Sequence, residues 1–318
     1  CFTTVSEITN NECKELLDKA ADVVLMNGFE DDFVPQGTAF TGKRKRARSL
    51  MLNVANKLLG TNMGDDTLII GTSGRYEFKN KGIDVFLDSL NRLNRDKDLQ
   101  KNVLAFVNVP GWVGEPREDL QTRLKSKEKF DTPLEVPFIT HWLHNMTHDQ
   151  VLDMLKYLGM GNRPEDKVKV IFVPCYLDGK DGILNKEYYD LILGEDLSVY
   201  PSYYEPWGYT PLESVAFRVP TITTDLAGFG LWVNSLKNQH GLDNGVEVLH
   251  RADYNYSEVA DGIKDTIALF SGKTEIEVKE IRKHAAAVAE QALWKHFIKY
   301  YYEAYDIALR NAMKRQLN

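Results

Sequence analysis

Short apolar runs rich in β-branched residues alternate along most of the chain with segments of helical periodicity. Six runs are typical of buried strands: 67–73, 102–110, 168–174, 197–202, 219–224 and 245–250. Four segments between them repeat apolar residues at helical spacing: 82–94, 149–158, 186–194 and 255–270. This alternation predicts an α/β fold with a doubly wound, parallel, Rossmann-like sheet. The strands are apolar on both faces, as a sheet covered by helices on both sides requires.

Three parts of the chain depart from this alternation, and they set the predicted domains. Residues 1–60 read as the end of a truncated N-terminal domain and a linker helix, the helix starting near Lys43. Residues 61–272 form the predicted Rossmann-like domain, with an insertion at 110–147 rich in Pro, Gly and charge. Residues 273–318 read as two C-terminal helices. The opening CFTTVSEIT lacks a Met and resembles the interior of a strand, so we expect that an upstream part is missing.

Composition narrows the class of protein. The chain has 318 residues, of which 43% are hydrophobic and 27% charged, as is ordinary for a globular protein. Its net charge of −7 argues against a general nucleic-acid surface, so we interpret the basic run 43–48 as a solvated helix face. The three cysteines are far apart, and no apolar run approaches transmembrane length. We therefore expect a cytoplasmic protein that does not bind membranes.

The segment SYYEPWGYTPLES, residues 202–214, places Glu205 and Glu213 eight positions apart. Thr210 as N-cap, Pro211 as the first helical residue and Glu213 two residues later predict a capping box at the start of a helix. The capping box explains the second glutamate without any ligand.

The same capping box leaves Glu205, Trp207 and Gly208 unexplained. A helix that begins at the carboxyl end of a parallel strand presents free N–H groups and a positive dipole to an anion. We therefore expect a phosphate near Thr210, with Glu213 on a neighbouring hydroxyl group.

A second loop lies at the same predicted edge of the sheet. The segment GTSGRYEFKNKG, residues 71–82, follows one strand and precedes a helix, and it carries Arg75 and Lys81. Two cations beside a helix N-terminus suit a diphosphate, because arginine offers a planar fork and lysine a point charge. The alternative is that both are solvated loop charges.

Four motifs together resemble the glycogen synthases of the animal and fungal type and their bacterial relatives. They are SGRYEFKNKG, VKVIFVP, VYPSYYEPWGYTPLES and PTITTDLAGFG. These enzymes are retaining glycosyltransferases of the GT-B fold, and the similarity runs over essentially the whole chain. The spacing of the two glutamates alone would be a weak signal.

The resemblance implies roles for the residues of these motifs. Glu205 matches the carboxylate beside the reacting sugar, and Glu213 matches the residue that binds the ribose. Arg75 and Lys81 match the cations that hold the donor diphosphate, and Thr210 matches a phosphate-contacting threonine. We therefore expect Glu205, Arg75 and Lys81 to act in catalysis, without a metal ion or another cofactor.

Further donor-binding residues follow from the same resemblance. Tyr188 falls where the family stacks an aromatic ring on uracil, although Tyr189 is adjacent. Gly208 and Tyr209 belong to the predicted donor site, and residues 227–230 match the last loop of the active site.

The resemblance implies a glycogen (starch) synthase, which transfers glucose with retention from UDP-glucose, or from ADP-glucose, to the non-reducing end of an α-1,4-glucan. Nothing in the chain matches the glycine-rich N-terminal domain of the family. We therefore expect this chain to be the donor-binding part, with C-terminal helices that cross back towards the absent domain, and to be inactive alone. The alternative is a non-catalytic module that binds a nucleotide sugar or a glycan. The sequence leaves open whether the protein forms a homo-oligomer.

Three further motifs carry weaker signals. His141, His144 and His148 have near-helical spacing, but no cysteine or carboxylate nearby completes a zinc site, so we interpret them as the surface of an inserted helix. The SGKT of residues 271–274 follows a predicted helix and lacks the first glycine of a P-loop. The helix 279–294 is Ala-rich where allosteric relatives carry the arginines that sense glucose 6-phosphate, so we expect no such activation.

Overall fold

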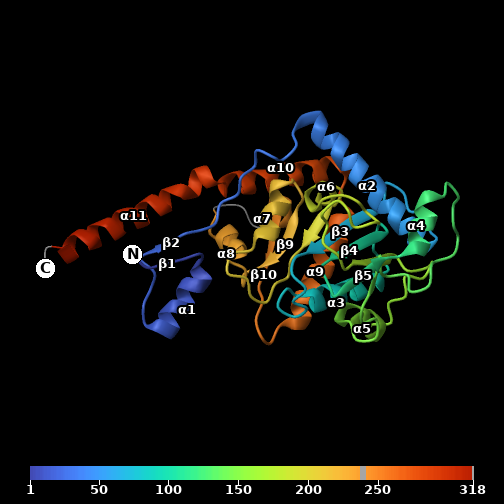
Figure 1. Cartoon of the computed structure of the whole chain (residues 1–318), viewed down its shortest axis with the longest axis horizontal. Coiled ribbons are helices and arrows are strands. Elements are labelled where there is room, and N and C mark those ends of the chain that lie inside the picture. The colour runs from blue at the N-terminus through green and yellow to red at the C-terminus, as the bar shows by residue number, and fades with distance from the viewer. Residues whose placement is uncertain (237–240, 317–318) are drawn as a thin grey trace.

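The computed structural model describes residues 1–236 and 241–316, and its centre is a six-stranded parallel sheet. The strand order is β10-β9-β8-β3-β4-β7 (Figure 1). The strands are β3 (Leu68–Ser73), β4 (Val103–Asn108), β7 (Val168–Val173), β8 (Leu197–Val199), β9 (Thr221–Thr224) and β10 (Val246–Leu249). All six predicted strands are confirmed. The order reverses between β3 and β8, which is the switch point at which such sheets bind ligands.

Helices cover both faces of this sheet, as the doubly wound prediction requires (Figure 1). One face carries α3 (Ile83–Asn94), α5 (Gln150–Tyr157) and α9 (Tyr256–Ser271). The other carries α2 (Gly37–Leu59), α6 (Tyr188–Ile192), α7 (Tyr209–Ala216) and α10 (Glu275–Gln291). The four predicted helices of the alternating region are therefore confirmed as α3, α5, α6 and α9.

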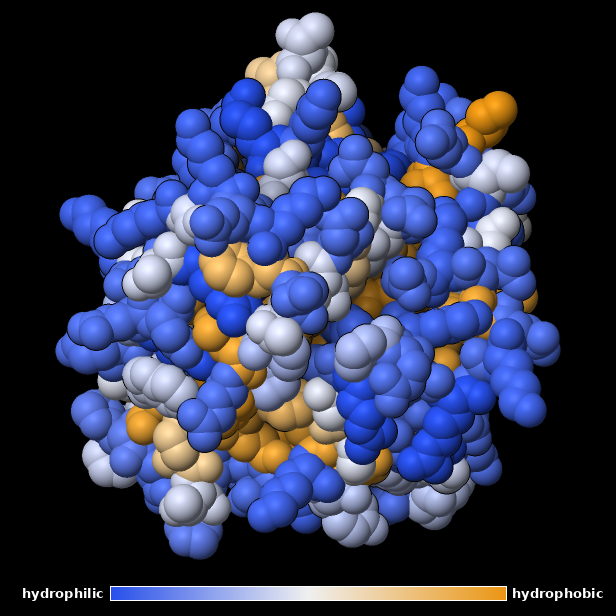
Figure 2. Space-filling view, turned by 90° about the vertical axis from the view of Figure 1, so that its right-hand side faces the viewer, coloured by the Kyte–Doolittle hydropathy of each residue, from blue (hydrophilic) through white to orange (hydrophobic). Residues whose placement is uncertain are grey.

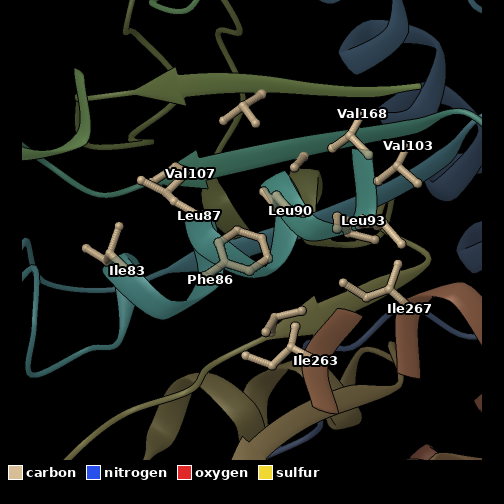
Figure 3. Packing of buried hydrophobic residues seen from close by; sticks show 14 of the residues in the cluster. Ile83, Phe86, Leu87, Leu90, Leu93, Val103, Val107, Val168, Ile263 and Ile267 are labelled. Atoms are coloured by element: carbon tan, nitrogen blue, oxygen red, sulfur yellow. The ribbon is translucent and has the colours of Figure 1, made fainter. Parts of the chain in front are cut away.

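Alternating side chains of each strand enter different cores. Ile70 of β3 joins the core under α3 and α9, whereas its neighbour Ile69 joins the core under α2. Figure 3 shows the first of these cores, where Phe86 and Leu90 of α3 pack between the sheet and α9. Both faces of such a strand are covered by helices and buried, which explains why the central strands read as continuous apolar runs.

The first sixty residues form a short parallel pair and two helices. Strands β1 (Thr3–Thr4) and β2 (Val23–Val24) pair beside α1 (Glu7–Leu17). The second helix, α2, begins earlier than the predicted Lys43, and its apolar side packs on β3, β4 and β7. The predicted domain division after residue 60 stays a prediction.

The segment 110–147 lies at the β7 edge of the central sheet, where Ile139 pairs with Phe172. It contains β5 (Val113–Pro116), α4 (Glu118–Lys125) and β6 (His141–Leu143), and the two strands pair antiparallel. Arg117 is fully buried there and donates to Asp119 and to the carbonyl groups of Glu135 and Val136. Figure 2 shows this end of the molecule, where apolar side chains surface among hydrophilic ones.

The predicted helix over residues 141–148 is wrong. His141 and Leu143 are buried, whereas Trp142 and His144 between and after them face outward. This alternation has the period of a strand, and pairing with β5, distant in sequence, decides it over the near-helical spacing of the histidines.

The chain ends in helices, as predicted. Helix α8 (Gly228–Ser235) and the short helix η1 (Leu242–Asn244) flank the last strands, and α10 is followed by α11 (Trp294–Gln316). The far end of α11 extends away from the sheet (Figure 1). Within the described residues, no helix combines the length and apolarity needed to cross a bilayer.

Candidate functional site

The loop after β3 carries the two predicted cations. Arg75 is 74% exposed at its side chain and pairs with Glu77 at 2.9 Å. Lys81 is instead mostly buried and forms an ion pair with Glu205. Burial lowers the pKa of Lys81, and Arg75 acts in the same direction, whereas the Glu77 carboxylate opposes both.

Gly82 explains how the loop reaches that glutamate. It precedes α3 with a positive φ of 68°, and a Cβ atom there would collide with the carbonyl oxygen of Pro201. The absence of a side chain lets the loop after β3 lie directly against the loop after β8. Lys81 and Glu205, which belong to these two loops, are thereby brought into contact.

Glu205 is held by its backbone as well as by its side chain. Its N–H donates to the carbonyl group of Leu226 at 3.1 Å, and the N–H of Gly228 donates to its carbonyl group at 3.0 Å. The segment 227–230, predicted to be the last loop of the site, therefore lies directly beside Glu205. Its carboxylate is 18% exposed.

Trp207, which the capping box left unexplained, is part of the core. It is 3% exposed and its ring packs edge-on against Phe229 and Phe297, at centroid distances of 6.1 and 6.0 Å. Its role in the glutamate motif is therefore to anchor the loop to α8 and α11.

The predicted capping box at Thr210 is wrong. Helix α7 begins at Tyr209, and its N-cap is Gly208, which has a φ of 106° and no side chain to cap with. This backbone conformation favours glycine, so the helix starts earlier than the Thr-Pro signal indicates. Pro211 then lies in the first turn, where the N–H that it lacks would have had no intrahelical partner.

A cavity of about 380 Å³ lies at the switch point and joins four of the predicted residues. Arg75, Tyr188, Thr210 and Glu213 all line it. Gly208 and Tyr209 do not line it, and neither do Lys81 and Glu205, which lie next to it through the loops that hold Arg75 and Thr210.

The structure separates the two adjacent tyrosines. Tyr188 lines the cavity, and its hydroxyl group points inward to the Ser73 hydroxyl at 2.8 Å. Tyr189 turns away, stacks on Phe217 and donates to the Glu213 carboxylate at 2.7 Å. Burial raises the pKa of Glu213, and the hydrogen bond from Tyr189 opposes that shift.

The sequence prediction missed the far wall of the cavity. Asn108 is the last residue of β4, Pro110 follows that strand, and Tyr176 follows β7 with 77% of its surface exposed. The available signal was their position at the ends of two buried strands, because the carboxyl ends of parallel strands meet at one edge.

His141 has neighbours that the sequence did not reveal. Cys175 and Asp181 place potential ligand atoms within 4.8 Å of it and of one another. All but the thiol are already engaged: Nε2 of His141 bonds the Asp181 carbonyl group, Nδ1 bonds the Thr140 hydroxyl, and the Asp181 carboxylate accepts from the backbone amides of residues 183–185. Burial raises the pKa of the Cys175 thiol to about 12, which disfavours a thiolate ligand.

A second group of cations lies at the opposite, amino-terminal edge of the sheet. The interpretation of residues 43–48 as a solvated helix face is wrong for Arg44 and Arg48, which turn inward. They pair with the two oxygens of Asp196 at 2.5 and 2.6 Å, and Asp196 also accepts from the Ile69 amide. Their helix packs on the sheet, so one face of the basic run is buried and makes contacts within the protein.

Arg282 of α10 approaches the same group. It donates to the Glu195 carbonyl group at 3.2 Å, and its second terminal nitrogen is buried without a partner among the described residues. A hollow of about 540 Å³ adjoins it, lined also by Lys101, Lys273 and Lys279.

Comparison with solved structures identifies the fold. The sucrose-phosphate synthase of Thermosynechococcus elongatus matches with a TM-score of 0.55 at 15% identity, over 97% of this chain and 58% of that one. The HepE protein of Anabaena, solved in complex with UDP and glucose, matches with a TM-score of 0.55 at 16% identity, over 97% of this chain and 62% of that one. The fold is therefore that of the GT-B glycosyltransferases.

The particular family follows from the sequence comparisons. The family model described as glycogen synthase matches residues 1–114 and 119–318. The glycogen [starch] synthase of Neurospora crassa is 27% identical over 379 aligned residues, which cover 100% of this chain and 53% of that protein. Isoform 1 of Saccharomyces cerevisiae is 28% identical, over 99% of this chain and 53% of that protein. This chain belongs to the glycogen synthase family, and it spans about half the length of the curated relatives it matches.

Proposed function

We propose that this chain binds the nucleotide-diphosphate glucose donor, UDP-glucose in the first place, of a retaining α-1,4-glucan synthase. The observation that carries the proposal is the single cavity at the switch point that Arg75, Tyr188, Thr210 and Glu213 line together. Sheets of this class bind their ligands at that point.

Each chemical group of the proposed donor has a suitable binding group among the residues that line the cavity. The first amides of α7 and the exposed guanidinium of Arg75 suit the diphosphate. The Glu213 carboxylate suits the ribose hydroxyl groups, and the rings of Tyr188 and Tyr176 suit the two faces or the edge of a base.

The ion pair of Lys81 and Glu205 suits the reacting end of the donor. In the proposed transfer, the bond between the anomeric carbon of glucose and the diphosphate breaks, and a bond to the terminal 4-hydroxyl of the glucan forms on the same face. The proton of that hydroxyl passes to the departing phosphate. Lys81 would stabilise the negative charge that develops there, and Glu205 would stabilise the positive charge on the sugar. Gly208 and Tyr209 would act by shaping the turn that starts α7.

Calorimetry with UDP in the presence of EDTA tests the proposal. We expect binding to persist in EDTA, and Arg75→Ala to weaken it by about 1.5–3 kcal/mol, the range for hydrogen bonds to charged groups. Arg95→Ala is the matched control, because Arg95 is also exposed but ends α3 at the far edge of the sheet. Binding that disappears with EDTA, or that Arg75→Ala leaves unchanged, would refute the proposed diphosphate site.

The competing proposal is a non-catalytic module that binds a nucleotide sugar or a glycan. The contact between Lys81 and Glu205 favours the enzyme, because a module has no need of a buried carboxylate beside the diphosphate site. In the full-length protein, Glu205→Gln would lower kcat far more than it lowers donor affinity.

A further inference from the structure

Asn108 is the last residue of β4, and it lines the cavity at the switch point. Its side chain is buried, with 9% of the residue exposed. The Oδ1 atom has no hydrogen-bond partner in the part of the chain that the structure describes. Nothing in the glutamate motif or in the two cations accounts for this residue.

The chain satisfies comparable groups close by. The carboxamide of Asn162 is equally buried, and it bonds the N–H and carbonyl groups of Val170 and the carbonyl group of Pro137. Ser73, at the end of β3, bonds Tyr188. A buried amide oxygen without a hydrogen-bond partner costs free energy, so the unpaired Oδ1 of Asn108 at a cavity wall points to a partner that the described residues do not supply.

The position of Asn108 indicates which part of a ligand it meets. Strand β4 lies between β3 and β7. Arg75 follows β3, and Thr210 lies in the helix after β8, so the diphosphate groups gather at that side of the cavity. Tyr176 follows β7 at the other side. Asn108 therefore lies between Ser73 and Val173, the last residues of β3 and β7, and two strands away from β8 and the helix that follows it.

We propose that the carboxamide of Asn108 binds the edge of the donor's nucleobase, through an N–H donor and an acceptor that lie side by side on that edge. The inference rests on the proposed function, because it assigns one more contact to the same donor. A carboxamide presents one acceptor and one donor side by side. Uracil offers the complement through N3–H and O4, and adenine offers it through its 6-amino group and N1. Rotation about the broad terminal torsion of Asn108 brings its oxygen or its nitrogen to the cavity.

The test is calorimetry of wild type and Asn108→Leu with three probes: UDP, ADP and inorganic diphosphate. Leucine has nearly the same size but no polar atoms. We expect the affinity for the nucleotide that binds best to fall about tenfold, while the affinity for diphosphate changes less than twofold. Asn234→Leu, on the exposed surface of α8, makes the same chemical change away from the cavity and controls for it. The melting temperature of Asn108→Leu should be equal to that of wild type or higher, since an unpaired polar group is removed.

The outcomes separate the inference from the function on which it rests. Wild-type binding of UDP or ADP that Asn108→Leu leaves unchanged overturns the role of Asn108 alone. A lower melting temperature, with equal losses for the nucleotide and the diphosphate, shows a structural role and also overturns it. Failure of wild type to bind either nucleotide overturns the proposed donor site itself. The UDP and ADP arms show which of the two bases the edge selects.

Discussion

The two edges of the central sheet both gather arginines, but they treat them in opposite ways. At the carboxyl edge, Arg75 is 74% exposed and pairs with Glu77, the glutamate two residues further on. At the amino edge, Arg44 and Arg48 are 20% and 12% exposed and share both oxygens of Asp196. The first edge leaves a cation available to a ligand, and the second supplies its own anion.

This difference shows that charge alone does not identify a ligand site. The basic run 43–48 carries more positive charge than the loop after β3. Two of its arginines, however, form ion pairs with Asp196 that hold α2 on the sheet. What distinguishes the carboxyl edge is a helix N-terminus and a cavity beside it. The exposed guanidinium of Arg75 lines this cavity, and so does Asn108, whose Oδ1 has no hydrogen-bond partner among the described residues. Each of the following predictions tests one side of this contrast.

The largest effect should come from Asp196→Ala. Burial acts to raise the pKa of Asp196, but Arg44 and Arg48 hold it below its ordinary value, so the carboxylate is charged in the folded protein. Its removal leaves two partly buried guanidinium groups without their counter-ion, and breaking such a pair costs about 3–5 kcal/mol. We expect urea unfolding to show a loss of this size in the free energy of unfolding.

The same variant sharpens the contrast between the edges. Below its unfolding transition, Asp196→Ala should bind UDP with wild-type affinity, because the cavity lies at the other edge of the sheet. A loss of less than about 1 kcal/mol in stability, the range of exposed ion pairs, would show that the amino edge is not held by Asp196.

A smaller effect concerns Glu213 and pH. Burial raises the pKa of Glu213, so the group becomes neutral on acidification at a higher pH than an ordinary glutamate does. A carboxylate accepts hydrogen bonds more strongly than a neutral carboxyl group, by about 1 kcal/mol. UDP affinity relative to that of Glu213→Gln should therefore fall about fivefold as the pH falls through the raised pKa.

Tyr189 provides the control for this assignment. Its hydroxyl group donates to Glu213 at 2.7 Å and opposes the rise in pKa. Tyr189→Phe removes that bond without touching the cavity, so the fall in affinity should move to higher pH. A profile that does not move would mean that another group titrates.

Much of the fold could be predicted from the sequence, because the information is local. The strands of the central sheet other than β10 are buried on both faces, and each of the six reads as an apolar run of its own. The errors arose where a distant partner decides the structure. Residues 141–143 form a strand because they pair with β5. Helix α7 begins at Tyr209, because a positive φ at its N-cap, Gly208, overrides the signal of Thr210 and Pro211.

The residues of the candidate site also fall into those that local sequence motifs predict and those that only the three-dimensional structure reveals. Arg75, Tyr188, Thr210 and Glu213 belong to motifs and were found from sequence, and the structure brings them to one cavity. Asn108 was missed because it is a single polar residue at the end of an apolar run. Its role is inferred from the order of strands in the sheet and from the missing partner of its Oδ1 atom, and the local sequence reveals neither.

The smallest expected effect concerns glucose 6-phosphate at the amino edge. From the sequence, the helix 279–294 is Ala-rich and offers few cations to a phosphate. In the structure, Arg44 and Arg48 reach Arg282 of that helix from α2, so three arginines converge there. The expectation of no activation now depends on Asp196, because its carboxylate already pairs with both Arg44 and Arg48. A free phosphate must displace a carboxylate that the fold holds in place, so we expect glucose 6-phosphate to activate the full-length protein less than tenfold at sub-saturating donor, which corresponds to a coupling below about 1.4 kcal/mol. Stronger activation would contradict this expectation. It would show that the arginines of the amino edge, like Arg75 at the carboxyl edge, are available to bind a ligand.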